Sequence, residues 1–171
     1  MADAHAALDD AAGWLKPGTG PGYLASEIAE TRAALLWLQR NPDAAIEEAE
    51  RALHLSDHPH ATGRALLTLG WACFSAGRFQ DARHSVEECL DLVAKKNLKL
   101  VEPEVKALAV RFHWYADPSA SQMEHATEFV GRAHRIGLRQ TRVETRVARL
   151  EIAWELENWD VFDEDVQAVQ S

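Results

Sequence analysis

The sequence predicts an all-α protein built from antiparallel helical hairpins. Apolar residues recur every three or four positions in successive segments, and short breaks rich in Gly, Pro and Asn separate these segments. Small residues alternate with larger ones on the apolar faces, as closely packed helices require. A chain of 171 residues with 47% hydrophobic residues can bury a substantial core.

The clearest hairpin covers residues 61–92. Two amphipathic stretches flank a turn at Ala76-Gly77-Arg78. The first stretch has Gly70 within its apolar stripe, where the lack of a side chain lets another helix come close. The apolar faces of the two stretches consist of Leu66, Leu69, Cys73 and Phe74, and of Phe79, Ala82, Val86, Cys89 and Leu90.

A similar hairpin precedes it at a fixed distance. The small residues Ala45 and Ala52 recur as Ala82 and Cys89, 37 residues later in both cases. Pro42 and Asp43 are typical of a helix start, because proline suits the first helical position and an acid suits the positive end of the helix dipole. A loop is expected at residues 56–60 between the two hairpins.

Two further hairpins and an N-terminal segment complete the expected organisation. A short helix over residues 3–15 ends at a Pro/Gly-rich linker, so residues 1–22 precede the repeats. The repeat domain then spans residues 23–171, in hairpins at about 23–57, 61–96, 102–136 and 139–170. The third is expected to be irregular, because its break at Asp117-Pro118-Ser119 has no glycine.

The motif formed by Leu69-Gly70, Gly77, Phe79, Ala82 and Cys89-Leu90 resembles the tetratricopeptide repeat (TPR). This resemblance implies hairpins stacked as a right-handed TPR-like superhelix, whose first helices line a concave face. It also implies a non-catalytic scaffold that binds a peptide or protein partner. Residues 23–170 are similar as well to the divergent repeats of MalT-like and LuxR-like bacterial transcription regulators, which implies a sensor or effector-binding domain.

The concave face supplies the first candidate site. Alignment to the TPR pattern places on this side Trp37, Arg64, Leu67, Trp71, Phe74, His113 and Trp114. Trp37, Trp71, Trp114 and Trp154 fall one to each first helix, and exposed rings there would anchor an extended or helical peptide. The alternative is that these residues pack neighbouring repeats together.

An arginine cluster supplies the second candidate. Residues 132–149 contain six arginines and one acid, so this window carries +5 while the remainder of the chain carries −14, for a net charge of −9. Arg142, Arg146 and Arg149 share one helical face and suit an anionic partner. The alternatives are that the acidic segment 160–165 neutralises them, or that they form a solvated face.

Composition disfavours several partner classes. The net charge of −9 argues against nucleic acid binding, and no apolar run approaches the roughly 20 residues of a membrane span. The acidic N-terminus lacks the features of a secretory signal, so a cytoplasmic location is expected. Cys73 and Cys89 lie on apolar stripes and are expected to pack as small hydrophobes rather than as a disulfide.

Enzymatic chemistry is not expected either. His54, His58 and His60 are interrupted by Pro59, so no metal site is predicted there. The sequence has no phosphate-binding loop, nucleophile elbow or metalloprotease motif, so no cofactor and no catalysis are expected. The alternative to a peptide-binding scaffold is a homo-oligomeric module, in which apolar ends of the stack pair as a homodimer.

Overall fold

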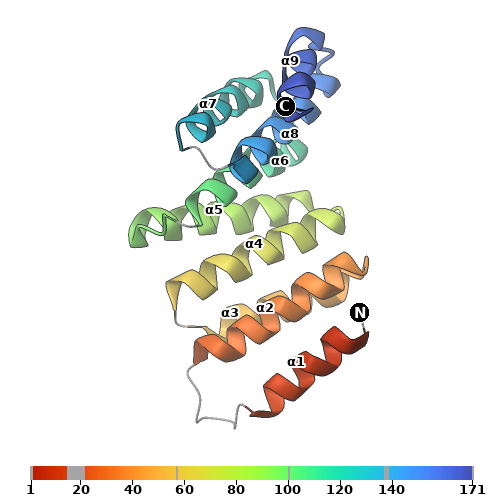
Figure 1. The fold of residues 1–171 in the computed structure, drawn as a ribbon, viewed down its shortest axis with the longest axis vertical. Helices are drawn as coiled ribbons and strands as arrows, with labels where there is room; N and C mark the ends of the chain where they lie inside the picture. The colour runs from red at the N-terminus through yellow and green to blue at the C-terminus, as the bar shows by residue number, and fades with distance from the viewer. Residues whose placement is uncertain (1, 15–21, 57, 100, 137–138, 171) are drawn as a thin grey trace. The chain divides into compact units, whose positions relative to one another are not determined.

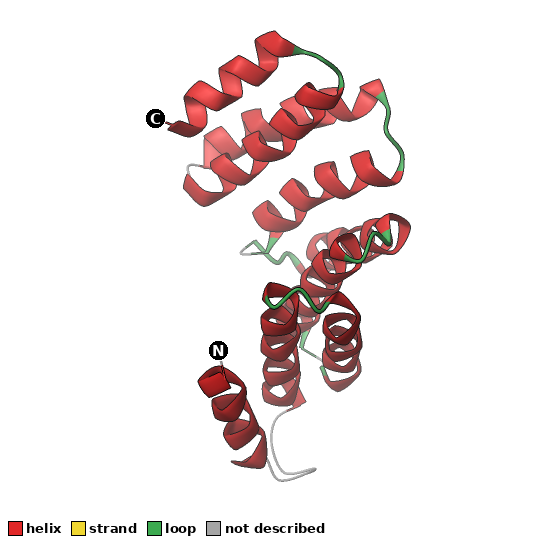
Figure 2. Cartoon of the chain, turned by 90° about the vertical axis from the view of Figure 1, so that its right-hand side faces the viewer, coloured by secondary structure: helices red, strands yellow, loops and turns green. Residues whose placement is uncertain are grey.

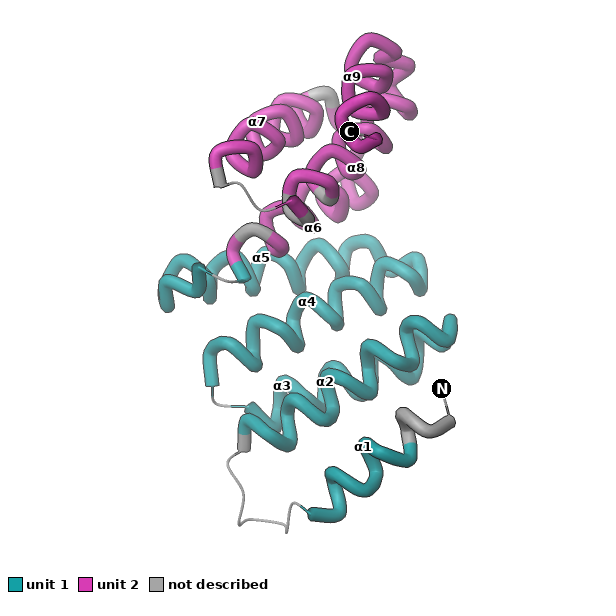
Figure 3. Tube along the Cα trace, in the orientation of Figure 1, with its two compact units in different colours: residues 1–101 teal, residues 102–171 magenta. Residues whose placement is uncertain are grey.

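The computed structural model describes residues 2–14, 22–56, 58–99, 101–136 and 139–170. Within these residues it contains nine α-helices and no strand, which confirms the predicted all-α class (Figures 1 and 2). The chain forms two compact units, residues 1–101 and 102–171 (Figure 3). The boundary between the units falls inside the single repeat domain expected from residue 23 onwards. Most of the expected Pro/Gly linker lies outside the described residues.

Unit 1 consists of two helical hairpins preceded by one helix. Its helices are α1 (Ala2–Trp14), α2 (Gly22–Leu38), α3 (Pro42–Leu55), α4 (Pro59–Ser75) and α5 (Phe79–Lys96). Helix α2 pairs with α3 and α4 with α5, and α4 also packs against both α2 and α3 (Figure 1). Helix α1 contacts α2, and Arg32 donates to Asp9 at 2.5 Å across this contact.

Small side chains hold the helices of unit 1 together. The recurring residues Ala45, Ala52, Ala82 and Cys89 are each 0% exposed. A further small-residue cluster joins α2, α3 and α4 through Ala29, Ala52 and Ala65. Because these side chains occupy little space, the helix backbones come close enough for side-chain to backbone hydrogen bonds. Ser26 Oγ donates to the Ala52 carbonyl oxygen at 2.9 Å, and Cys89 Sγ donates to that of Gly63 at 3.4 Å.

Unit 2 has larger residues in its core. Its helices are α6 (Glu102–Ala116), α7 (Ala120–Ile136), α8 (Arg139–Glu155) and α9 (Trp159–Gln170). Helix α8 contacts the other three, and the core between α6, α7 and α8 contains Val110, Trp114, Ala126, Ala148 and Ile152. A two-pronged ion pair links α6 to α8, because Arg111 donates to the two Glu151 carboxylate oxygens at 2.8 and 2.5 Å.

The starts of two helices have clear local causes. Helix α4 begins at Pro59, inside the loop expected at residues 56–60. Proline has no backbone N–H to donate and its fixed φ matches the first helical position, so the helix includes it. Helix α9 begins at Trp159, where the Asn158 side-chain oxygen accepts from the Val161 N–H at 3.4 Å and caps the helix.

Three of the four hairpins share one turn geometry. After α2, α4 and α8, the chain makes the same three backbone hydrogen bonds and passes through one residue with positive φ. These residues are Arg40 (φ 60°), Gly77 (φ 75°) and Glu157 (φ 55°). The described residues between α6 and α7 contain no positive φ, so that connection differs. The spacing between Arg40 and Gly77 is 37 residues, the same as between the buried small residues.

Among the described residues, every helix is too short or too polar to cross a bilayer.

We predict that Gly77→Ala lowers the free energy of unfolding by about 1 kcal/mol, because a Cβ disfavours the left-handed conformation. An added Cβ would meet nothing within 4 Å, so the cost is conformational rather than steric. Urea denaturation followed by circular dichroism measures this cost. The matched control is Gly131→Ala inside α7, which is expected to be neutral or stabilising. Equal stability of native protein and Gly77→Ala would contradict the assigned turn.

Candidate partner-binding site

Helices α2 and α4 together present one continuous surface in unit 1, the α2/α4 face. Helix α2 contributes residues at helical spacing, namely Glu27, Glu30, Thr31, Trp37 and Leu38. Helix α4 contributes Ala61, Arg64, Thr68, Trp71 and Ser75 in the same way. The two helices lie side by side (Figure 1), so the two sets of side chains meet along their length.

The first half of the α2/α4 face is polar. Glu30 Oε1 accepts from Thr68 Oγ1 at 2.7 Å and from Arg64 Nη2 at 3.2 Å. Glu30 is only 7% exposed, whereas 54% of the Arg64 side chain faces solvent. The hydrogen bonds therefore fix the buried carboxylate and leave the arginine accessible.

The second half of the face is aromatic. The Trp37 ring stacks on Trp71 at a centroid distance of 5.4 Å, and Trp37 Nε1 donates to Ser75 Oγ at 2.7 Å. Phe74 meets Trp71 edge-on at 6.1 Å and also contacts Phe79 at 5.4 Å. This aromatic row holds the rings in fixed orientations at low entropic cost.

Two open clefts lie on the α2/α4 face. The smaller, of about 150 Å³, is lined by Glu27, Glu30, Thr31, Ala61 and Arg64. The larger, of about 550 Å³, is lined by Trp37, Leu38, Arg40, Pro42 and Ser75. Leu38 is 60% exposed beside the larger cleft, so this end offers an apolar surface next to an arginine.

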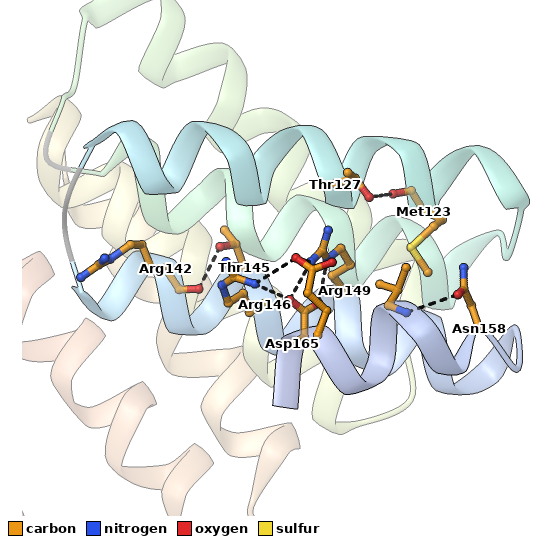
Figure 4. A network of polar contacts seen from close by, with 10 residues as sticks. Met123, Thr127, Arg142, Thr145, Arg146, Arg149, Asn158 and Asp165 are labelled. Atoms are coloured by element: carbon orange, nitrogen blue, oxygen red, sulfur yellow. Dashed lines mark hydrogen bonds and ion pairs between the residues drawn. The ribbon is translucent and has the colours of Figure 1, made fainter. Parts of the chain in front are cut away.

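The arginine cluster lies in unit 2, on α7 and α8, and Arg146 and Arg149 are paired with acids of α9. Asp165 on α9 is 0% exposed and accepts from Arg149 Nε and Nη2 and from Arg146 Nη1, each at 2.7 Å (Figure 4). Glu164 accepts from Arg149 Nη2 at 3.1 Å. The hydrogen bond to Asp165 raises the pKa of the Arg149 guanidinium, so its charge is permanent. Two arginines and two carboxylates thus compensate one another.

Residues 24–95 match the family model of the tetratricopeptide repeat. Residues 24–95 are TPR-like repeats. The matched segment covers the two hairpins α2–α3 and α4–α5, whose turns and small residues recur at 37-residue spacing. No curated protein matches the sequence.

The family match agrees with the resemblance identified from the Leu-Gly motif, and repeats of this family generally mediate protein–protein interactions. The shared turn geometry of three hairpins sets which residues correspond. Trp37, Phe74 and Trp154 each lie three residues before the positive-φ position and are equivalent. Trp37 and Trp71, which are 34 residues apart, are therefore neighbours across the α2/α4 face and not equivalent positions.

The predicted site residues separate into three groups. Trp37, Arg64, Trp71 and Phe74 belong to or border the α2/α4 face of the TPR-like unit. Leu67 and Trp114 are core residues, only 4% and 6% exposed. His113, half-buried, belongs to unit 2, as do Arg142, Arg146 and Arg149.

Sequence reasoning missed several residues at these sites. Leu38, Arg40 and Ser75 border the larger cleft. Ser75 lies one helical turn after Trp71, and this spacing was the available signal for it. Trp154, Trp159 and Phe162 form an aromatic patch with centroid distances of 5.3 to 6.0 Å. Trp154 and Trp159 are 55% and 49% exposed, so the patch lies at the surface of unit 2.

Neither cysteine thiol has the surroundings of a nucleophile. Cys73 and Cys89 are both free and buried. Burial raises the pKa of the Cys73 thiol to about 11, so it stays protonated near neutral pH. In the part of the chain that the structure describes, no three His, Cys, Asp or Glu residues are close enough to hold a metal ion.

The pairing of Arg146 and Arg149 with Asp165 generates a prediction about stability. We expect Asp165→Ala to lower the free energy of unfolding by about 3–5 kcal/mol, because it leaves the buried Arg149 guanidinium with only the exposed Glu164 as an acidic partner among the described residues. The control is Asp163→Ala, an exposed acid on the same helix, which should change stability by less than about 0.5 kcal/mol. Denaturant titration measures both values. If the two variants are equally stable, the buried network does not support unit 2.

Proposed function

We propose that the protein is a non-catalytic scaffold that binds a peptide segment of another protein on the α2/α4 face. The observation that carries this proposal is the 550 Å³ cleft beside the aromatic row, where Leu38 is 60% exposed. Stacked rings and a leucine suit an apolar anchor of the ligand. The nearby Arg40 and the accessible Arg64 suit an acidic residue beside that anchor.

The family supports the scaffold, and the chemistry of the face supports the ligand class. Repeats of this kind generally mediate protein–protein interactions. The rings on the face are fixed by stacking and by the Trp37–Ser75 hydrogen bond, so little conformational entropy is lost when a ligand binds. The face also offers two clefts of different polarity along one line, which suits an extended segment more than a compact ligand.

A substitution at Leu38 tests the peptide-binding proposal. Peptides would be selected from a random display library against the full chain, and their affinity measured by calorimetry. We expect Leu38→Asp to weaken the selected peptides at least tenfold, because it removes about 1.4 kcal/mol or more of apolar contact and places an acid beside the anchor.

The matched control is Leu55→Asp at the end of α3, outside the face and 38% exposed. This variant should bind the selected peptides with native affinity. Peptides that bind the Leu38→Asp variant as tightly as the native chain do not use this cleft, and that result would overturn the proposal.

Self-association is a second candidate function, favoured by the aromatic patch of unit 2. Trp154, Trp159 and Leu156 are each more than 40% exposed, at 55%, 49% and 41%. A symmetric dimer uses the same surface of both copies, and flat aromatic surfaces serve well as its centre.

Light scattering across a concentration series tests this candidate. We expect the native chain to have the mass of a dimer and Trp159→Ala to have the mass of a monomer, because the substitution removes one of the three rings of the patch. The control Trp14→Ala removes an 87% exposed tryptophan outside the patch and should leave the mass unchanged. A native monomer at every concentration would reject self-association.

A further inference from the structure

Unit 2 contains a basic cavity that the proposed function does not use. The cavity lies between α7, α8 and α9, has a volume of about 290 Å³ and takes four basic side chains from two helices. His134 comes from α7, and Arg139, Arg142 and Arg146 come from α8. Its apolar wall includes Val143 and Val169. No acid lines the cavity among the residues that the structure describes.

The arginines of this cavity differ in how their charges are compensated. Arg146 is bound to Asp165 at 2.7 Å. Arg142 lies one helical turn earlier and points away from Asp165 (Figure 4). Neither Arg139 nor Arg142 makes an ion pair with any described residue. The cavity therefore has a positive charge that the surrounding described part of unit 2 leaves uncompensated.

One donor atom of Arg142 is buried without a hydrogen-bond acceptor in the described part of the chain. Arg142 Nε is buried and has no hydrogen-bond partner among the described residues. A buried donor without an acceptor costs roughly 1–3 kcal/mol, and more when the group is charged. Because the arginine also lines the cavity, an acceptor placed inside the cavity would remove this cost.

We infer that this cavity binds a phosphate dianion, either free or as a phosphate monoester. Arginine presents several N–H donors in a planar fork that matches phosphate oxygens, and a dianion balances the charges of Arg139 and Arg142. The His134 ring adds a further polar group at the same cavity. The volume of about 290 Å³ accommodates a phosphate together with a small attached group.

This inference does not depend on the peptide-binding proposal. The cavity is formed by unit 2 alone, whereas the α2/α4 face belongs to unit 1. Failure of one proposal therefore leaves the other unaffected.

Calorimetry with inorganic phosphate tests the inference on the full chain at neutral pH and constant ionic strength. We expect saturable binding at one site, and a rise in the unfolding temperature with phosphate concentration. Arg142→Gln and, separately, Arg139→Gln should each weaken binding at least tenfold, since each removes one charge-assisted donor. Phenyl phosphate in the same assay distinguishes a monoester from the free ion, and binding of either supports the inference.

The matched control is Arg132→Gln on α7, an exposed arginine that pairs with Glu128 and does not line the cavity. It should bind phosphate with native affinity. Without phosphate, Arg142→Gln should unfold no more readily than the native chain, because the substitution removes an unpaired buried donor.

Three results would overturn the inference. The first is the absence of saturable binding by the native chain. The second is equal binding by the Arg142 and Arg132 variants. The third is equal stabilisation by phosphate and by chloride at the same ionic strength, which would mean that ions only screen the arginine charges.

Discussion

Close packing of helices through small side chains is the constraint on which unit 1 depends. Ala45, Ala52, Ala82 and Cys89 are fully buried and recur at one spacing. With so little side-chain volume between them, helices approach until a side chain reaches a neighbouring backbone, as between Ser26 and the Ala52 carbonyl group. A larger residue at such a position would force the helices apart.

This constraint also decides where the aromatic residues lie. A tightly packed interface of alanines has no room for an indole ring, so Trp37 and Trp71 extend beyond the interface. There they stack on each other and form the α2/α4 face. Unit 2 packs its tryptophan differently. Trp114 is only 6% exposed and lies within a core of larger side chains. The same residue type therefore has different roles in the two units.

Much of the fold was predictable because it depends on local patterns. Helical periodicity, the turn glycine and the recurrence of small residues identified the hairpins, and helix bounds differed by only a few residues. The candidate site was only partly predictable. Burial of Leu67 depends on which neighbouring helix faces it, and the 34-residue spacing of Trp37 and Trp71 reflects contact across the face rather than equivalence. Three-dimensional packing, not local pattern, determines both.

The arginine cluster shows that the number of arginines in a sequence does not reveal how many of them are free to bind an anionic partner. Arg142, Arg146 and Arg149 share a helical face, yet two of them are bound to Asp165, which lies 16 residues beyond Arg149 in sequence. This pairing was one alternative predicted from the sequence, because the acidic segment 160–165 was a candidate for neutralising the arginines.

The sequence did not show which acid of segment 160–165 faces α8. Asp165 is the only one of those acids that is fully buried, because its position on α9 places it towards α8, whereas Asp160 and Asp163 are exposed. Arg142 lies a turn further from that acid and keeps its charge uncompensated within the described residues. The buried ion pairs with Asp165 thus compensate the charges of Arg146 and Arg149, and Arg142 is left beside the cavity without an acidic partner among the residues that the structure describes. The proposed anion site therefore depends on the arginine charge that α9 does not neutralise.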